Sequence, residues 1–89
     1  MSDAVGCSVS GEPAEARAFD GGTLQALTST ALAPGQRTEV CVVLSDRSVT
    51  AAAKSLGSRR RDDGRFEVRL RLLSLRREDR DALAAALRR

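Results

Sequence analysis

The residue types that most often carry catalysis are scarce in this chain. Histidine is absent, and the two cysteines, Cys7 and Cys41, lie far apart with no C-x-x-C spacing. No side chain therefore titrates near neutral pH to act as a general base or to activate a thiol. A zinc site would also lack its usual ligands. The adjacent acidic pairs, Asp62–Asp63 and Glu78–Asp79, point in different directions on a strand or helix. We therefore expect a protein that is not an enzyme and holds no metal.

Arginine is the abundant residue with specific binding chemistry. Residues 59–89 carry eleven arginines and six acidic residues, whereas residues 1–58 carry four basic and six acidic ones. A planar guanidinium group pairs well with carboxylates and phosphates. The simplest interpretation is a solvated charged surface in an arginine-rich composition, and the functional one is an anionic partner. The candidate contacts for such a partner are Arg59, Arg60, Arg61, Arg69 and Arg71.

The stretch FEVRLRLL, residues 66–73, predicts the strand that positions two of these arginines. Its apolar and charged residues alternate, which is typical of a strand with one face buried. Arg69 and Arg71 should then face outward. The apolar face should pack against Val40, Val42 and the helical residues Leu83 and Leu87; its members are Phe66, Val68, Leu70 and Leu72.

Other segments predict further strands and one helix. Residues 23–27, 38–45, 49–56 and 65–73 favour strands, and the APGQ sequence at 33–36 favours a type II turn. Residues 14–19 fit a strand or a helical turn, and GSRRRDDG at 57–64 fits a polar loop or distorted hairpin. Residues 76–88 predict a helix whose apolar stripe is formed by Leu75, Ala82, Leu83, Ala86 and Leu87.

The order of these elements indicates the fold class. Strands precede a single terminal helix without βαβ alternation, which favours a mainly β fold, an antiparallel sheet or small barrel with the helix at one end. A chain of 89 residues is long enough for one small domain. We assign residues 1–13 to a flexible N-terminal tail, with at most a short strand near residues 5–9, and residues 14–89 to the domain.

From about residue 22 to 88 the chain resembles a PilZ domain. The resemblance lies in the order of LQALTSTAL, APGQRTEVCVVLSDRSVTAAAKSL, a charged hairpin, and GRFEVRLRLLSLRREDRDALAAAL. It implies a six-stranded antiparallel β-barrel with a C-terminal helix. PilZ domains are known as bacterial receptors for cyclic di-GMP, which they bind through an R-x-x-x-R motif and a D/N-x-S-x-x-G motif.

Both ligand motifs are degenerate in this chain. Alignment of the second motif with ALTSTA places Ala26, Thr28 and Ala31 at its Asp/Asn, Ser and Gly positions. Only Thr28 keeps a hydrogen-bonding group, and Ala31 adds a methyl group where close backbone approach is needed. The first motif has no counterpart, because Arg17 is the only arginine before Arg37. The resemblance therefore implies a divergent regulatory or adaptor domain in bacterial signalling or motility.

These observations lead to expectations about partners and location. We expect an unidentified protein partner and no cofactor, with cyclic di-GMP binding by atypical contacts as the alternative. A small basic nucleic-acid-binding barrel is a further alternative, disfavoured because Phe19 and Phe66 are the only aromatic residues. A homodimer stays open. The chain has no apolar run long enough for a membrane span, and its cysteine use is typical of the cytoplasm.

Overall fold

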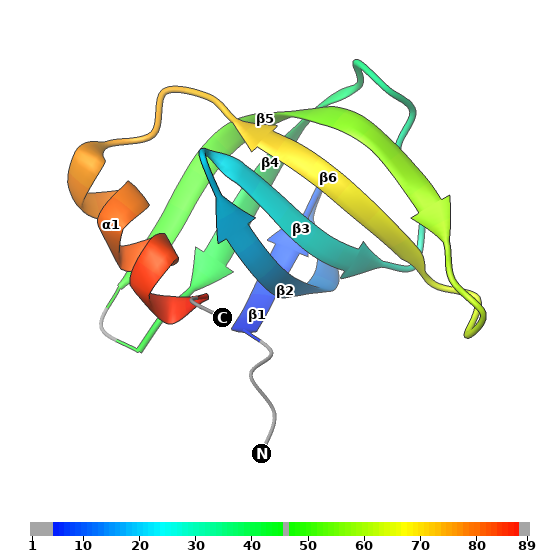
Figure 1. Ribbon diagram of the computed structural model, residues 1–89, viewed down its shortest axis with the longest axis horizontal. Coiled ribbons are helices and arrows are strands. Elements are labelled where there is room, and N and C mark those ends of the chain that lie inside the picture. The colour runs from blue at the N-terminus through cyan, green and yellow to red at the C-terminus, as the bar shows by residue number, and fades with distance from the viewer. Residues whose placement is uncertain (1–4, 46, 88–89) are drawn as a thin grey trace.

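Six antiparallel strands close into a barrel, and one helix follows them in the computed structural model, which describes residues 5–45 and 47–87 (Figure 1). Around the barrel the strands run in the order β1–β2–β3–β6–β5–β4. The predicted mainly β fold, an antiparallel barrel with a C-terminal helix, is confirmed. In chain order the elements are β1 (Val5–Val9), β2 (Glu12–Asp20), β3 (Thr23–Thr28), β4 (Arg37–Val43), β5 (Ser48–Arg60), β6 (Phe66–Leu72) and α1 (Arg77–Ala86).

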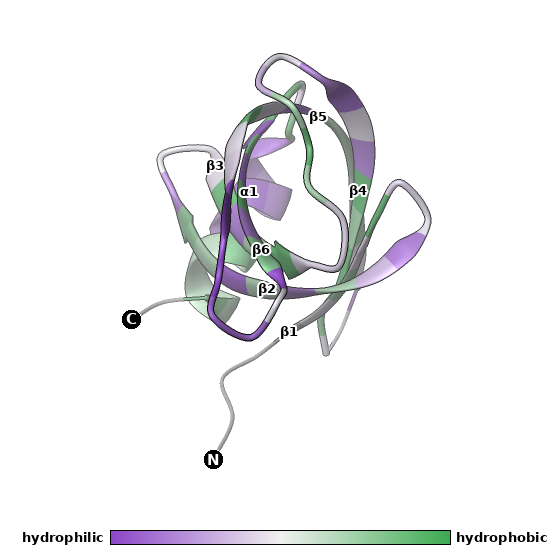
Figure 2. Ribbon diagram, turned by 90° about the vertical axis from the view of Figure 1, so that its right-hand side faces the viewer, coloured by the Kyte–Doolittle hydropathy of each residue, from purple (hydrophilic) through white to green (hydrophobic). Residues whose placement is uncertain are grey.

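Alternating side chains fill the barrel interior with aliphatic residues. On β6, Val68, Leu70 and Leu72 are buried, and the intervening Arg69 and Arg71 are exposed, as the alternation predicts. Val40 and Val42 belong to the same core cluster. Figure 2 views this barrel from the end opposite α1, with the strands surrounding the interior. The two faces of β6 are therefore those read from its sequence.

Phe66 and the long β5 depart from the expectations. Phe66 is only half-buried, because it lies at the end of β6 beside the hairpin turn. β5 continues to Arg60, although we expected a strand ending at residue 56. A register shift between Ser55 and Gly57 marks a bulge there. Gly57 has a φ of +129°, a conformation that other residues rarely adopt, so the bulge lets the strand continue through a sequence that resembles a loop.

The helix closes one end of the barrel with two leucines. Leu83 and Leu87, one turn apart, are buried in the core cluster. The ion pair between Arg47 Nη1 and Asp79 Oδ1, at 3.3 Å, links the segment between β4 and β5 to the helix. The helix spans Arg77–Ala86, shorter than the expected 76–88, and residue 88 lies outside the described residues. Ala86, expected in the buried stripe, is exposed; the buried contacts are made by Leu83 within α1 and by Leu87, its C-cap residue.

The other end of the barrel is closed by Leu32, in the loop between β3 and β4. Leu32 is 7% exposed and belongs to the core cluster. The Ser58 hydroxyl holds this residue on both sides: it donates to the Leu32 carbonyl at 2.9 Å and accepts from the Leu32 N–H at 3.2 Å. The loop then turns at Ala33–Gln36, where the Gln36 N–H donates to the Ala33 carbonyl at 3.0 Å. Gly35 has a φ of +86°, as the predicted type II turn requires.

Residues 5–13 belong to the barrel, whereas we expected them to form a tail. β1 pairs with β2 and also with β4, and the second pairing closes the sheet. Cys7 and Val9 point inward and are buried. The alternation of small residues with Cys7 and Val9 was too weak in the sequence to outweigh the glycines and the proline around it. Residues 14–19, left open between strand and helical turn, lie within β2. Residues 1–4 lie outside the described part of the chain.

Truncating Leu70 should test the two faces of β6. Leu70 is fully buried, so Leu70→Ala removes apolar contacts and leaves a cavity, at an expected cost of about 2–5 kcal/mol in the free energy of unfolding. Arg69 is exposed, and Arg69→Ser should change this free energy by no more than about 0.5 kcal/mol. Urea melts of both variants provide the measurement. Equal destabilisation by the two substitutions would contradict the assignment of faces.

Candidate functional site

The three positions taken from the PilZ ligand motif do not lie together on the surface. Ala26 is fully buried on the inner face of β3, beside Ala16 and Val68 of the neighbouring strands. Thr28 is buried, and its hydroxyl donates to the Thr30 carbonyl at 2.7 Å. Ala31 is exposed in the following loop. Only Thr28 and Ala31 therefore border the same surface hollow.

That hollow, near the Leu32 end of the barrel, has about 180 Å³ of space and a mixed polar and apolar lining, in which Glu12 is the one charged residue. Several of its polar groups already have partners. Thr30 donates to Glu12 Oε1 at 3.3 Å, the hydroxyls of Ser10 and Thr38 contact each other, and Gln36 Oε1 accepts from a loop N–H. No described residue lining it is basic. A phosphate group bound here would lack the cation that normally compensates its charge.

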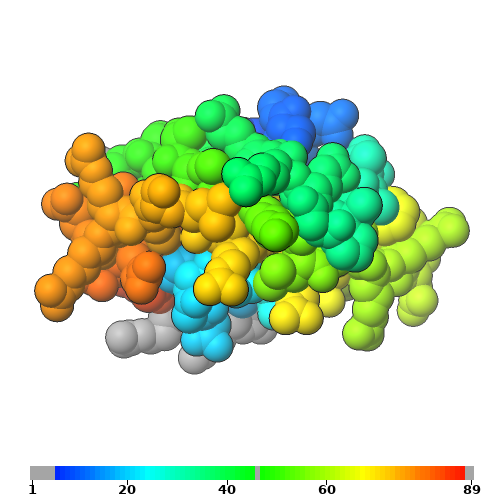
Figure 3. Space-filling model, turned by 90° about the horizontal axis from the view of Figure 1, so that it is seen from above, coloured from blue at the N-terminus to red at the C-terminus, as the bar shows by residue number. Residues whose placement is uncertain are grey.

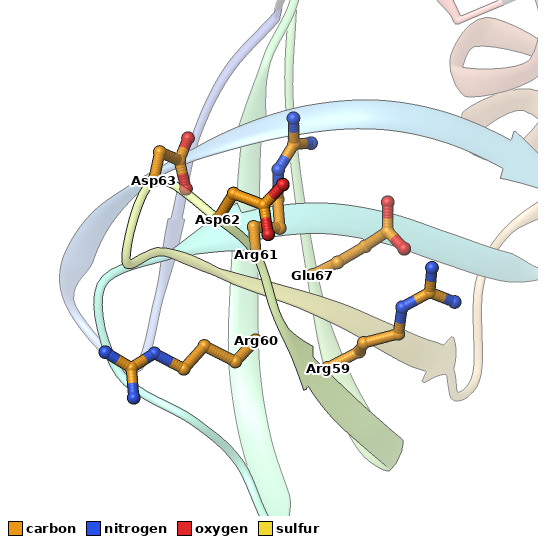
Figure 4. Close-up of a pocket in the computed structure, with 6 residues that line it drawn as sticks. All are labelled: Arg59, Arg60, Arg61, Asp62, Asp63 and Glu67. Carbon is orange, nitrogen blue, oxygen red and sulfur yellow. The ribbon is translucent and has the colours of Figure 1, made fainter.

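Arg59, Arg60 and Arg61 lie at the hairpin between β5 and β6, where a larger hollow of about 340 Å³ opens. The same hollow is lined by Asp62, Asp63 and Glu67, so its three positive and three negative formal charges cancel. Figure 4 shows the guanidinium group of Arg60 pointing away from those of Arg59 and Arg61. The cluster that is basic in sequence is therefore electrically mixed in space.

Hydrogen bonds within this hairpin turn stabilise its shape. The Arg61 N–H donates to the Arg65 carbonyl at 2.7 Å. Asp63 accepts from the backbone N–H of Arg65 at 3.0 Å and from its Nε at 3.2 Å. The backbone hydrogen bond, with the neighbouring guanidinium groups, keeps the pKa of Asp63 below its usual value. Asp63 is thus a charged structural group of the turn.

Barrel register creates a different surface, on which basic residues of three strands lie side by side. Arg37 of β4 lies directly opposite Lys54 of β5, and Lys54 lies directly opposite Arg71 of β6. Residues paired in this way share a face, and all three are exposed. Arg69 lies two residues before Arg71 on the same outer face of β6, and it is paired with Gly57 of β5. We call Arg37, Lys54, Arg69 and Arg71 the cationic face; Figure 3 shows this side of the barrel, with the green atoms of the β4–β5 region beside the yellow atoms of β6.

The four basic side chains of the cationic face are not paired with carboxylates of the described residues. Within residues 5–45 and 47–87, none of its four side chains forms an ion pair. Like charges directly opposite each other on neighbouring strands destabilise a sheet. Elsewhere on the barrel, basic side chains do have acidic partners: Glu15 pairs with Arg17 at 3.2 Å and lies 4.0 Å from Arg65. The row of three cations therefore carries an electrostatic cost that an anionic partner would relieve.

Sequence reasoning found only half of this surface. Arg69 and Arg71 were identified because they occupy the polar positions of an alternating strand. Arg37 and Lys54 were missed, because each is a single basic residue in its own segment and only the strand register brings them beside Arg71. The alternation of 38–45 and 49–56 contained the signal, since it places both residues on the outward face. The pairing itself was not readable from one strand at a time.

The two cysteines lie on opposite sides of the barrel wall. Cys7 points inward and is buried, although residues 1–13 are predicted to form a tail, whereas Cys41 is half-exposed on the outer face of β4. Burial is the main reason that the pKa of Cys7 rises from 9.0 to about 11, with smaller contributions from Cys41 and Glu15. The Cys7 thiol is thus protonated at neutral pH, which does not suit it for nucleophilic attack.

The raised pKa predicts a loss of stability in alkali. Because the folded state keeps the proton on Cys7 more tightly than the unfolded chain, the stabilisation is complete below pH 9 and falls as the pH rises towards about 11. The chain has no tyrosine, whose phenol would otherwise add to the change in this range. Urea melts between these pH values measure the slope. Cys7→Ala should flatten the slope, and Cys41→Ala should reduce it only slightly, because burial is the main cause of the shift; an unchanged slope in Cys7→Ala would contradict the assignment.

Comparisons with known proteins add no relative. No protein-family model, no curated protein and no solved structure matches the chain. Among the described residues, no helix is long and apolar enough to cross a membrane, and no group of three or more potential metal ligands occurs. The resemblance to PilZ domains stays a prediction, and the cationic face is defined by the chain's own register.

Proposed function

We propose that this chain is a PilZ-like regulatory or adaptor domain without enzymatic activity, which binds an acidic surface of a partner protein. The observation that carries the proposal is the cationic face. Its four basic side chains are exposed, and none of them forms an ion pair with another described residue. Guanidinium groups on rigid strands are suited to carboxylates, which they bind with defined geometry. The proposed setting is the cytoplasm in bacterial signalling or motility.

Barrel closure determines how such a partner can bind. Each strand of the barrel has a neighbour on both sides, and at the cationic face β4, β5 and β6 are paired with one another. Recognition by β-augmentation is therefore not available at this face. A partner must use contacts with outward-facing side chains, and the basic residues of β4, β5 and β6 provide them.

The alternative functions are less well supported by the geometry. Cyclic di-GMP carries two phosphates, but the hollow that borders Thr28 and Ala31 has no basic lining residue. A single-stranded nucleic acid would need exposed aromatic platforms, whereas Phe19 and Phe66 are partly buried and pack against the core. The partner protein is thus the favoured ligand of the cationic face.

Capture experiments with matched variants test this function. The immobilised domain should retain a partner from an extract of its source cells, and Arg69→Ser/Arg71→Ser should weaken that binding roughly two- to thirtyfold, as two exposed ion pairs imply. The matched control Arg60→Ser/Arg61→Ser removes the same charge from the hairpin and should retain the partner. Equal retention by the Arg69/Arg71 variant and the wild type would contradict the proposal.

Titration calorimetry with cyclic di-GMP tests the main alternative. We expect a dissociation constant above about 100 μM, equivalent to less than about 5.5 kcal/mol of binding free energy. The reason is the absence of a cation beside Thr28 and the full burial of Ala26. A saturable titration in the low micromolar range would favour a receptor with atypical ligand contacts instead.

A further inference from the structure

The geometry of the cationic face specifies the shape of its partner, an inference that rests on the proposed function. Arg37, Lys54 and Arg71 occupy one row across three neighbouring strands. Strands in a sheet are about 4.8 Å apart, so the outer two backbone positions of the row are roughly 10 Å apart. The row runs across the strands, with one cation at each step. A matching partner must present three acidic groups along a line of about this length.

An α-helix meets this requirement better than an extended chain. On a helix, acidic residues at i, i+4 and i+7 lie along one face and span about 10.5 Å. In an extended chain, same-face residues at i, i+2 and i+4 span about 13 Å. An extended chain would also gain no backbone hydrogen bonds at this row, because β4, β5 and β6 are already paired with one another there. The spacing and the strand pairing both favour a helix.

An exposed leucine adjoins the cationic face. Leu56 lies in the bulge of β5, two residues after Lys54 and next to Gly57, which pairs with Arg69. It is 40% exposed, and Val43 is the only other large apolar side chain with comparable exposure among the described residues. A phosphate backbone has no use for an apolar contact at this position. An amphipathic helix does, because its acidic stripe borders an apolar one.

We propose that the cationic face, together with Leu56, binds an amphipathic acidic helix of a partner protein. Carboxylates at i, i+4 and i+7 of that helix lie against Arg37, Lys54 and Arg71, and an apolar side chain of the helix contacts Leu56. Binding relieves the repulsion within the row, because each cation gains an opposite charge. All contacts are solvent-exposed, so affinity falls as salt screens the charges.

Synthetic peptides provide the probe. The striped peptide is a fluorescent helical peptide with glutamates at i, i+4 and i+7 beside a leucine. Fluorescence anisotropy at low and high salt measures its binding to the domain, together with that of two control peptides of related composition. In the first control the glutamates are distributed around the helix, and in the second a central proline breaks the helix. We expect the striped peptide to bind about tenfold more tightly than either control, as three exposed ion pairs imply.

Variants of the intact domain locate the binding. Lys54→Gln/Arg71→Gln should weaken striped-peptide binding about fivefold or more, whereas Arg60→Gln/Arg61→Gln, with the same loss of charge, should change it by less than about twofold. Leu56→Ala should also weaken binding of the striped peptide without any change of charge. Urea melts of each variant confirm that the exposed substitutions leave the fold intact.

Several outcomes would overturn the inference. Equal affinity for the striped and redistributed peptides would contradict the proposal that the partner is a helix with one acidic face. Equal weakening by the two double variants would contradict the proposal that binding occurs at the cationic face. Failure of the striped peptide to bind at low salt would also reject it. Tighter binding of a single-stranded oligonucleotide, unaffected by Leu56→Ala, would replace the helix with a nucleic acid. Partner capture that depends on Arg69 and Arg71 without any peptide preference would leave the proposed function standing and reject only the helix.

Discussion

Pairing between β1 and β4 is the contact on which the rest of this structure depends. It joins the first strand to the fourth, with Cys7 opposite Val42 and Val9 opposite Val40, and turns an open sheet into a closed barrel. Closure gives every strand a neighbour on both sides and limits the free edges that promote association between sheets. It also requires each strand to place alternate residues inside and outside, so that an inward aliphatic set and an outward charged set arise together.

The interior filled by this closure is narrow, and its side chains are small. Valine, leucine and alanine, together with Cys7, form the core cluster, and neither phenylalanine is fully buried. Such a barrel needs a closing residue at each end, and these residues come from segments outside the strands: Leu83 and Leu87 from α1, and Leu32 from the β3–β4 loop. Because Ser58 holds Leu32 through two hydrogen bonds, a polar side chain of β5 positions an apolar residue of the core.

Much of this architecture could be predicted from local patterns. The alternation of β6, the β-branched composition of residues 38–45 and the turn at Pro34–Gly35 each act within a few residues, and the structure contains all three elements. What could not be predicted depends on contacts between distant segments. β1 is a strand because two others flank it, and β5 passes Gly57 because a bulge absorbs the extra residue.

The same distinction applies to the candidate site. Arg69 and Arg71 could be assigned to the surface from one strand, but the juxtaposition of Arg37, Lys54 and Arg71 is a property of register across three strands. The run Arg59–Arg61 looked more basic in sequence, yet the hairpin folds three carboxylates beside it. Proximity along the chain therefore overestimated one cluster and concealed the other, because a barrel sorts charge by strand position.

The position of β1 also has a consequence for how the chain assembles. β1 is made first, but its partner β4 follows after two further strands, and the pairing joins residues as distant as Cys7 and Val42. Contacts between distant residues require the closure of long loops, which slows folding. Until β4 is available, the hairpin of β1 and β2 carries an unpaired edge and the apolar side chain of Val9 without cover. During synthesis, this leading hairpin is the part of the chain most in need of protection from premature association.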